Sequence, residues 1–197
     1  MNLPNKLTIL RIILVPIMVV IPFLGIQGEW LHIPITYIII NIIFILAAFT
    51  DKLDGTIARK TNQVTTFGKF ADPLADKILV LAAMIMLVEF GKLPAWIPTI
   101  VVFREFVVSG YRLLEVEKGG KVVAASIWGK LKTVTQIIAI ILAFLDVNAF
   151  ATFIYNNLTG FSLVINVVAT GMMVVSVIAT IFSGWDYLKG SKKLFKD

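Results

Sequence analysis

Long uninterrupted runs of apolar residues divide this chain into six blocks. A membrane-spanning helix needs about 20 such residues, and the blocks lie at roughly Leu7–Ile26, Leu31–Thr50, Pro73–Phe90, Ala95–Leu114, Ala125–Leu145 and Phe161–Leu188. Of the 197 residues, 58% are hydrophobic and 15% charged, a balance that a soluble domain could not bury. Continuous blocks also argue against the alternating strands of a β-barrel. We therefore expect an all-α integral membrane protein with six transmembrane helices, forming a single domain over residues 1–197.

The positions of Lys and Arg predict how the helices are oriented. These residues gather in the N-terminal segment, the second and fourth connections and the C-terminal tail, whereas the other three connections contain only Lys92. Basic loops remain on the cytoplasmic side, so we expect both termini to be cytoplasmic in a multi-pass protein of a bacterial cytoplasmic membrane. The net charge of +6 then suits anionic membrane lipids, and we expect no nucleic-acid partner. The first block turns back at "IQGEWLHIP" without a cleavage pattern, which predicts a hairpin and a retained first helix.

Four aspartates, Asp51, Asp54, Asp72 and Asp76, interrupt this apolar sequence between the second and third blocks. At 100° per residue, Asp51 and Asp54 fall on one helical stripe with the small residues Gly55 and Ala58, and Arg59 lies at its edge. After the polar loop "KTNQVTTFGKFA", a helix is expected to begin near Pro73 and to place the other two aspartates one turn apart. Four carboxylates can then converge.

Such a cluster requires positive charge, because neighbouring carboxylates repel one another near hydrocarbon. Arg59 and Lys77 could supply part of it, but dense oxygen ligands favour Mg²⁺ or Mn²⁺, and two ions form the usual clamp for phosphoryl chemistry. The chain has no cysteine, which excludes a thiolate metal site. The alternative is that these acids are ordinary interfacial charges at helix ends.

The complete spacing favours the metal site. It reads Asp51, two residues, Asp54, Gly55, two residues, Ala58, Arg59, eight residues, Gly68, three residues, Asp72, three residues, Asp76. This pattern resembles, with no departure, the signature of the CDP-alcohol phosphatidyltransferase family. The resemblance implies transfer of a phosphatidyl group from the lipid CDP-diacylglycerol to an alcohol, with release of CMP at the inner leaflet. It further implies that the four aspartates hold two divalent ions and that Asp76 is also the base.

The resemblance also implies which residues contact CDP-diacylglycerol. They are Asn5, Thr8, Gly55, Ala58, Arg59, Thr65 and Gly68. The opening "NLPNKLTILRIILVP" is similar to that of family members whose acceptor is sn-glycerol 3-phosphate. Without the motif, Pro4 and Asn5 could simply cap a helix while Arg11 reaches toward the lipid surface.

A phosphorylated acceptor needs its own cations, and "FREFVVSGYR" and "SIWGKLKT" provide them. Arg104 and Glu105 interrupt an apolar block, which marks them as site residues, although a Glu105–Arg112 pair is an alternative. Lys132 lies on a polar stripe with Ser126, Gly129, Thr133 and Gln136, so we favour it over Lys130 as the inward ligand. The candidate ligands of the acceptor phosphate are Arg104, Arg112, Lys132, Lys130 and Arg11.

These segments resemble members of the family that use sn-glycerol 3-phosphate, and the resemblance suggests a homodimer. Serine, inositol phosphate or phosphatidylglycerol remain alternative acceptors. A divalent-cation transporter is an alternative of another class, because acids can line a membrane pathway. Against transport, the acids cluster at one membrane face, and the sixth block offers only Asn166, Thr170, Ser176 and Thr180 as deep polar groups.

Overall fold

Six long helices make up most of the structure, a computed structural model that describes residues 3–60, 66–117 and 127–190. Within these ranges, the side chains of 3–4, 51–60, 66–67, 69–70, 112–117 and 190 are not described. The helices are α1 Leu3–Val20, α2 Ile35–Lys60, α3 Thr66–Glu89, α4 Trp96–Glu117, α5 Ile127–Leu145 and α6 Gly160–Gly190. Short 3₁₀ segments, η1 Ile21–Leu24 and η2 Thr152–Ile154, follow α1 and precede α6.

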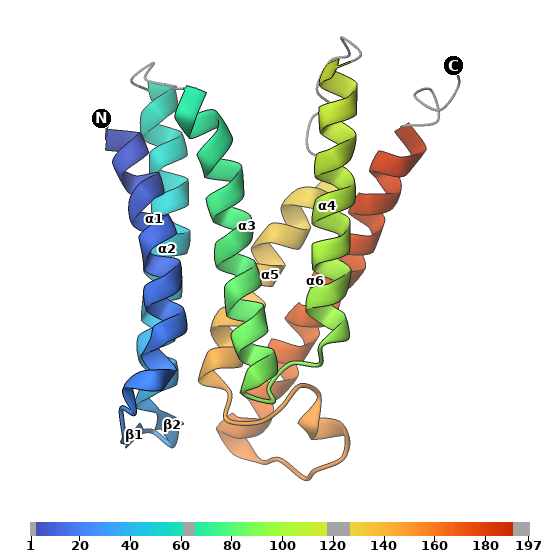
Figure 1. Ribbon diagram of the computed structural model, residues 1–197. Helices are drawn as coiled ribbons and strands as arrows, with labels where there is room; N and C mark the ends of the chain where they lie inside the picture. The colour runs from blue at the N-terminus through green and yellow to red at the C-terminus, as the bar shows by residue number, and fades with distance from the viewer. Residues whose placement is uncertain (1–2, 61–65, 118–126, 191–197) are drawn as a thin grey trace.

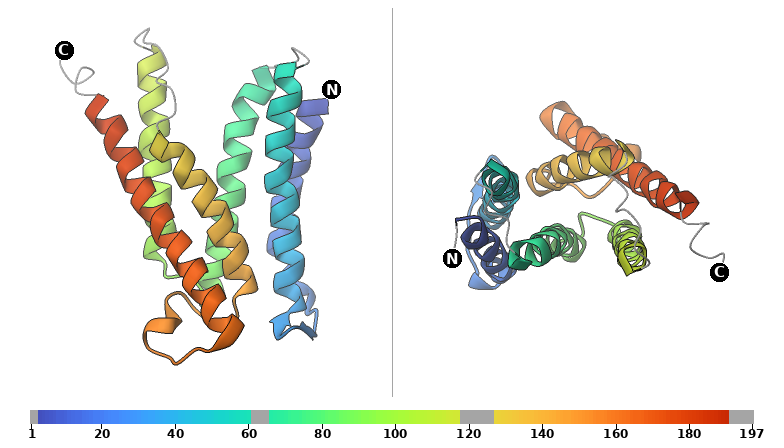
Figure 2. Two further views of the ribbon diagram at one scale, coloured as in Figure 1. Left: turned by 180° about the vertical axis from the view of Figure 1, so that it is seen from behind. Right: turned by 90° about the horizontal axis from the view of Figure 1, so that it is seen from above.

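Helices α1 to α4 run roughly along a common direction, and α5 and α6 are inclined to them (Figures 1 and 2). The start of α1, the end of α2, the start of α3, the end of α4 and the end of α6 lie at one end of the molecule. The other views place α1, α2 and α3 in one group and α4, α5 and α6 beside it (Figure 2). The aspartate-bearing ends of α2 and α3 therefore share one end of the molecule with the N-terminal turn of α1.

Three helical stretches are long and apolar enough to cross a membrane within the described ranges: Asn5–Leu24, Ile127–Leu145 and Gly160–Lys189. The apolar part of α2, Ile35–Thr50, is shorter. Large apolar side chains such as Ile13, Phe103 and Ile181 are exposed on the outer faces, as expected where lipid rather than water surrounds a helix. The predicted all-α membrane fold is confirmed at this level.

The helices meet in an apolar core that fixes α3 among its neighbours. Ile40 and Phe44 from α2, Met84 and Leu87 from α3 and Phe144 from α5 are fully buried. Close packing of such side chains is as dense as a molecular crystal and leaves little freedom for rotation of a helix. The core thereby sets the direction in which α3 presents its polar residues.

A two-stranded hairpin connects α1 to α2, as the segment "IQGEWLHIP" predicted. Strands β1 Glu29–Trp30 and β2 Ile33–Pro34 pair antiparallel. Leu31 and His32 between them have φ of 54° and 63°, and positive φ at both central residues matches the twist of a two-residue hairpin. This turn lies at the end of the molecule opposite to the α2–α3 junction (Figure 1).

The predicted start of the third helix near Pro73 is wrong. Helix α3 begins at Thr66, about two turns earlier, and α2 continues to Lys60, so both helices extend into the segment expected to be a polar loop. Proline within a helix removes one backbone hydrogen bond, a loss that membrane helices tolerate when neighbours pack around them. Ala71 and Ala75 are buried on either side of Pro73, and this packing retains the helix.

Candidate active site

Two aspartates of α3 are each held by a side chain from α1. Thr8 donates its hydroxyl to Asp72 Oδ1 at 2.5 Å, and Arg11 Nη1 lies 2.5 Å from Asp76 Oδ1. Residues three or four apart lie on one face of a helix, so this matched pair of contacts follows directly from the spacing on each helix. Thr8 and Arg11 are fully buried, whereas the side chain of Asp76 is 42% exposed. The carboxylate of Asp76 is therefore anchored and still accessible.

Two further predicted residues lie one turn away from these contacts. Asn5 precedes Thr8 on α1 and is buried, and Gly68 precedes Asp72 on α3 and is also buried. The described part of the predicted nucleotide site thus follows the contact between α1 and α3.

The remaining predicted residues of that site cannot be placed at the level of side chains. Asp51, Asp54, Gly55, Ala58 and Arg59 belong to the continuous helix α2, but their side chains are outside the description, and Thr65 lies outside the described residues. The end of α2 that carries them lies at the same end of the molecule as the start of α3 (Figure 1). Convergence of all four aspartates stays a prediction.

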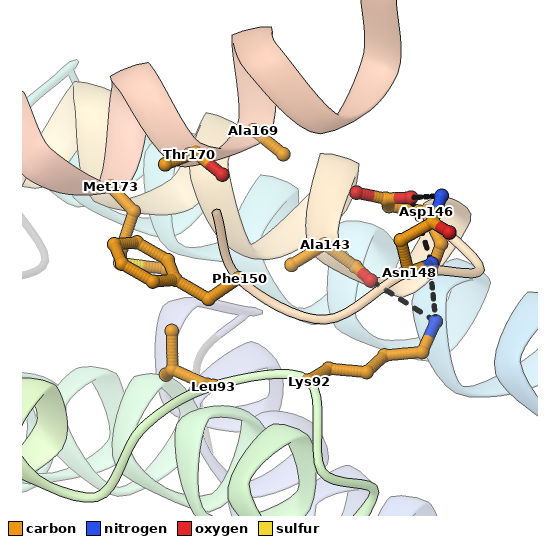
Figure 3. Close-up of a pocket in the computed structure, with 9 residues that line it drawn as sticks. All are labelled: Lys92, Leu93, Ala143, Asp146, Asn148, Phe150, Ala169, Thr170 and Met173. Atoms are coloured by element: carbon orange, nitrogen blue, oxygen red, sulfur yellow. Dashed lines mark hydrogen bonds between the residues drawn. The ribbon is translucent and has the colours of Figure 1, made fainter. Parts of the chain in front are cut away.

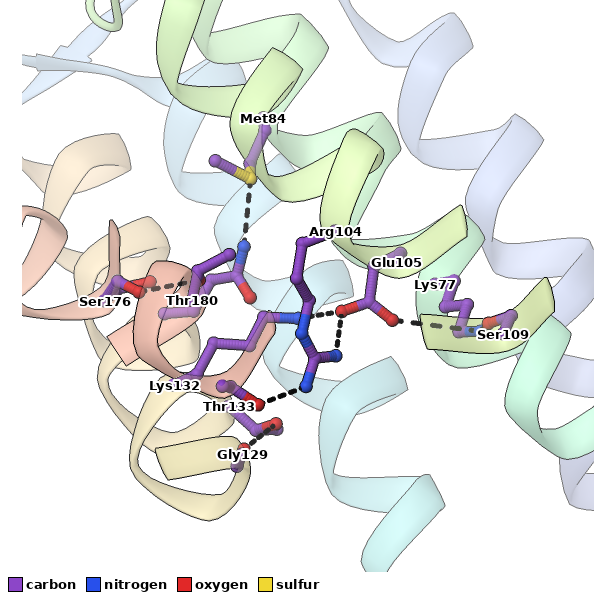
Figure 4. A network of polar contacts seen from close by, with 12 residues as sticks. Lys77, Met84, Arg104, Glu105, Ser109, Gly129, Lys132, Thr133, Ser176 and Thr180 are labelled. Carbon is purple, nitrogen blue, oxygen red and sulfur yellow. Dashed lines mark hydrogen bonds and ion pairs between the residues drawn. The ribbon is translucent and has the colours of Figure 1, made fainter. Parts of the chain in front are cut away.

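A second polar cluster joins α3, α4 and α5 around one carboxylate (Figure 4). Glu105 Oε1 accepts hydrogen bonds from Arg104 Nη1 at 2.8 Å and from Lys132 Nζ. Glu105 Oε2 lies 3.8 Å from Lys77 Nζ, which also donates to Ser109 Oγ. The side chains of Arg104, Glu105 and Lys132 are 12%, 18% and 9% exposed, so one carboxylate holds two cations largely out of solvent. The third cation, Lys77, is 38% exposed.

Arg104 is further fixed by α6. Its Nη2 donates to Ser183 Oγ, and its guanidinium carbon lies 5.8 Å from the centre of the Tyr187 ring. Its stem passes close to Gly184, where an added Cβ would lie 3.4 Å from Arg104 Cγ. Arg104 Nε is buried and has no hydrogen-bond partner among the described residues. A planar cation held on three sides is pre-organised to bind an oxyanion.

The two clusters adjoin each other through α3. Asp76 and Lys77 are consecutive, so their Cα atoms are about 3.8 Å apart and their side chains diverge by about 100° around the helix. Asp76 turns to α1, and Lys77 turns to α4. The expectation that Lys77 helps to neutralise the aspartates is therefore wrong, because its contacts are with Ser109 and Glu105.

The other predicted acceptor ligands differ in their surroundings. Lys132 is buried, as its place on the polar stripe predicts, whereas Lys130 is exposed. Thr133, placed on the same stripe, is exposed and bonds within α5. Arg11 contacts Asp76 rather than this basic cluster, and the side chain of Arg112 is not described.

At the opposite end of the molecule, Lys92 joins the α3–α4 connection to the end of α5 (Figure 3). Its Nζ donates to the carbonyl oxygens of Ala143, at 3.3 Å, and Asp146. The carboxylate of Asp146 in turn accepts from Asn148 and Asn166 at 2.6–3.0 Å. The adjoining cavity, of about 10 Å³, has room for a single water molecule. These groups satisfy one another, so the cluster fastens the connections and does not form a substrate site.

Comparison with known proteins relates this arrangement to an enzyme family. The sequence model of the family described as CDP-alcohol phosphatidyltransferase matches residues 1–182. This chain belongs to the CDP-alcohol phosphatidyltransferase family. It is 43% identical over 202 residues to the CDP-diacylglycerol–glycerol-3-phosphate 3-phosphatidyltransferase of Bacillus subtilis, covering 99% of this chain and 97% of that protein. The Haemophilus influenzae protein of the same name is 35% identical over 195 residues, covering 97% and 94%. A probable phosphatidylglycerophosphate synthase of Mycobacterium tuberculosis is 35% identical over 187 residues, covering 95% and 80%.

The metal chemistry expected of a CDP-alcohol phosphatidyltransferase fits the donors that the structure describes. Asp72 and Asp76 offer carboxylate oxygens, the ligands that Mg²⁺ and Mn²⁺ prefer, and both project from one side of α3 toward α1. No set of three acidic or imidazole ligands gathers among the described side chains, and those of Asp51 and Asp54 lie outside them. Arg11 supplies one positive charge to this pair of acids.

Sequence reasoning selected Arg104, Glu105 and Lys132 as site residues but did not predict their pairing. It missed that Glu105 contacts Arg104, Lys132 and Lys77. Ser183 was overlooked, although it follows Ser176 and Thr180 at intervals of four and three residues, and all three are fully buried. That periodicity in α6 was the signal that could have found it. The deep groups Asn166 and Thr170 instead bond to the α5–η2 connection, which gives no support to an ion pathway along α6.

Proposed function

We propose that this enzyme transfers the phosphatidyl group of CDP-diacylglycerol to sn-glycerol 3-phosphate, forming phosphatidylglycerophosphate and CMP. The observation that carries the proposal is the likeness over nearly the whole chain to relatives named for this reaction. The structure supports it by placing a basic cluster beside the aspartate face of α3, which meets the needs of a phosphorylated acceptor.

Asp76 is the proposed general base. The acceptor hydroxyl oxygen attacks the phosphorus atom that bears the diacylglycerol, the bond from this phosphorus to the oxygen of CMP breaks, and the hydroxyl proton passes to the carboxylate of Asp76. Arg11 fixes the carboxylate of Asp76, and the side chain is 42% exposed, so the carboxylate can face the hydroxyl. A base positioned within hydrogen-bonding reach contributes about 10²–10⁴ in rate.

Arg104 and Lys132 are the proposed ligands of the acceptor phosphate. Both are held by Glu105, and Lys77 links them to the helix that carries the base. With its phosphate bound here, glycerol 3-phosphate would extend its three-carbon chain from α4 and α5 toward Asp76. Arg112 is a second candidate near the end of α4, whereas exposed Lys130 is not expected to bind the phosphate, and Arg11 is better assigned to Asp76.

The four aspartates would hold two divalent ions, with Asn5, Thr8, Gly55, Ala58, Arg59, Thr65 and Gly68 around the CDP group. When bound, Mg²⁺ or Mn²⁺ supplies positive charge to the pyrophosphate and to the oxygens that become more negative as the bond breaks. Thr8 contributes by fixing Asp72, and buried Gly68 leaves space next to it.

We further propose that all six helices span the cytoplasmic membrane, with both termini and the active site on the cytoplasmic side, and that the enzyme is a homodimer. The apolar exposed faces and the distribution of basic residues support this topology. Accessibility labelling of single cysteines, introduced at the tip of the hairpin and in the C-terminal tail, tests it in intact cells because the native chain has no cysteine.

The direct test is an acceptor panel. Purified enzyme in mixed micelles would receive CDP-diacylglycerol, Mg²⁺ and one of four acceptors: glycerol 3-phosphate, serine, inositol phosphate or phosphatidylglycerol. We expect CMP release only with glycerol 3-phosphate. Turnover with another acceptor alone would replace the acceptor assignment, and Mn²⁺ flux into liposomes without CMP release would indicate a transporter.

A further inference from the structure

Glu105 is the only acidic side chain in contact with the basic cluster among the described residues. It bonds to Arg104 and Lys132 and lies near Lys77, so it joins cations from three helices. Like charges in a medium of low dielectric constant repel strongly. Without a carboxylate between them, the three cations would separate or lose their charge.

The charge that remains suits a particular ligand. Three cations and one carboxylate leave a formal charge of +2, and a phosphate monoester carries about −1.5 to −2 at pH 7. Donors also remain available. Arg104 Nε has no partner in the described part of the chain. The ammonium groups of Lys132 and Lys77 each have three N–H donors, and their hydrogen bonds to Glu105 and Ser109 do not use them all.

The orientation of the cluster depends on the same carboxylate. Arg104 is fixed from one side by Ser183 and from the other by Glu105. Lys132 is 9% exposed, and its ammonium nitrogen has Glu105 as its hydrogen-bond partner. The position of Lys132 Nζ is thus set through Glu105.

We infer that Glu105 is a positioning residue that selects a phosphate-monoester acceptor. It holds Lys132 and Arg104 at fixed places and, together with the nearby Lys77, leaves a net charge that matches the phosphate dianion. This inference rests on the proposed function. Glu105 itself does not touch the phosphate, because two anions would repel. It acts through the cations that it holds.

The test compares Glu105→Gln with Glu89→Gln, a matched change at an exposed acid near the end of α3. Glutamine keeps the shape and one acceptor oxygen but removes the charge. We expect Glu105→Gln to raise the KM for glycerol 3-phosphate at least about tenfold, the scale of one lost charge-assisted contact, with the KM for CDP-diacylglycerol within about twofold of wild type. Glu89→Gln should change neither.

Two further variants separate positioning from folding. Glu105→Asp keeps the charge on a shorter stem, so it should recover part of the acceptor affinity, and it carries the test if Glu105→Gln does not fold. Because Glu105 acts through Lys132, the Glu105→Gln/Lys132→Gln double variant should raise the acceptor KM little beyond the larger single effect. An acceptor KM within twofold of wild type, an equal rise in both KM values, or multiplicative effects in the double variant would overturn the inference.

The wild-type control separates this inference from the proposed function. If wild-type enzyme uses glycerol 3-phosphate and Glu105→Gln behaves normally, only the role of Glu105 fails. If wild type prefers inositol phosphate, the acceptor assignment fails, and the same KM comparison with that acceptor still tests Glu105. If only an acceptor without a phosphate monoester is used, both fail.

Discussion

Replacing Lys132 by Gln should weaken the binding of the acceptor far more than that of CDP-diacylglycerol. Lys132 is 9% exposed, so its ammonium group is screened little by solvent. A charge-assisted hydrogen bond to a phosphate contributes about 1.5–3 kcal/mol, and each 1.4 kcal/mol is a factor of ten. The KM for glycerol 3-phosphate should therefore rise by about 10- to 150-fold.

Lys130 provides the matched control, because it lies two residues earlier on α5 and is exposed. Lys130→Gln removes the same charge from the same helix and should change the acceptor KM by less than about threefold, as expected for a solvent-screened charge. Initial rates of CMP release at varied acceptor and fixed saturating CDP-diacylglycerol measure both variants. Equal effects of the two variants, or equal losses for the two substrates in Lys132→Gln, would refute the assignment of Lys132.

Three other predictions address the metal site, the base and the opposite end of the molecule. A chelator should abolish activity and added Mg²⁺ or Mn²⁺ should restore it; full activity in excess chelator would exclude the two-metal site. Asp76→Asn should lower kcat by about 10² or more, while its affinity for CDP-diacylglycerol stays within about tenfold of wild type. Asp51→Asn should instead lose metal affinity and nucleotide affinity together. Near-normal turnover of Asp76→Asn would show that another group is the base. Burial lowers the pKa of Lys92 from 10.5 to about 8, against the opposing charge of Asp146, so the native state releases this proton at lower pH than the unfolded chain does. The free energy of unfolding of wild type, relative to that of Lys92→Met, should then rise by up to about 3 kcal/mol between pH 8 and 10.5. Thermal unfolding in detergent measures it. A stability difference between the two proteins that does not change with pH would contradict the burial of a charged Lys92.

The sequence allowed accurate prediction of features that depend on one helix alone. The apolar runs predicted six helices, and the described ranges contain six, three of which have stretches long and apolar enough to cross a membrane. The burial of Lys132 and the exposure of Lys130 followed from helical periodicity, because two residues correspond to about 200° of rotation. The aspartate signature indicated the family because its intervals are fixed over two helix ends.

Features that depend on how helices rotate against one another were not predictable from spacing. Lys77 could face either the aspartates or α4, and only the packing of Met84 and Leu87 in the core sets its direction. Glu105 could pair with Arg112 on its own helix, but partners from α3 and α5 reach it across helix contacts. The start of α3 was misplaced because Pro73 is a common first-turn residue, whereas tertiary packing can hold a proline inside a helix.

The most direct test of the central claim is to follow both products of one reaction. Wild-type enzyme would receive CDP-diacylglycerol and radiolabelled glycerol 3-phosphate, and CMP release and label in the lipid phase would be measured together. Transfer predicts one labelled lipid molecule for each CMP released, with the lipid identified as phosphatidylglycerophosphate by mass spectrometry. Release of CMP without label in the lipid would show hydrolysis instead of transfer and would contradict the proposed function.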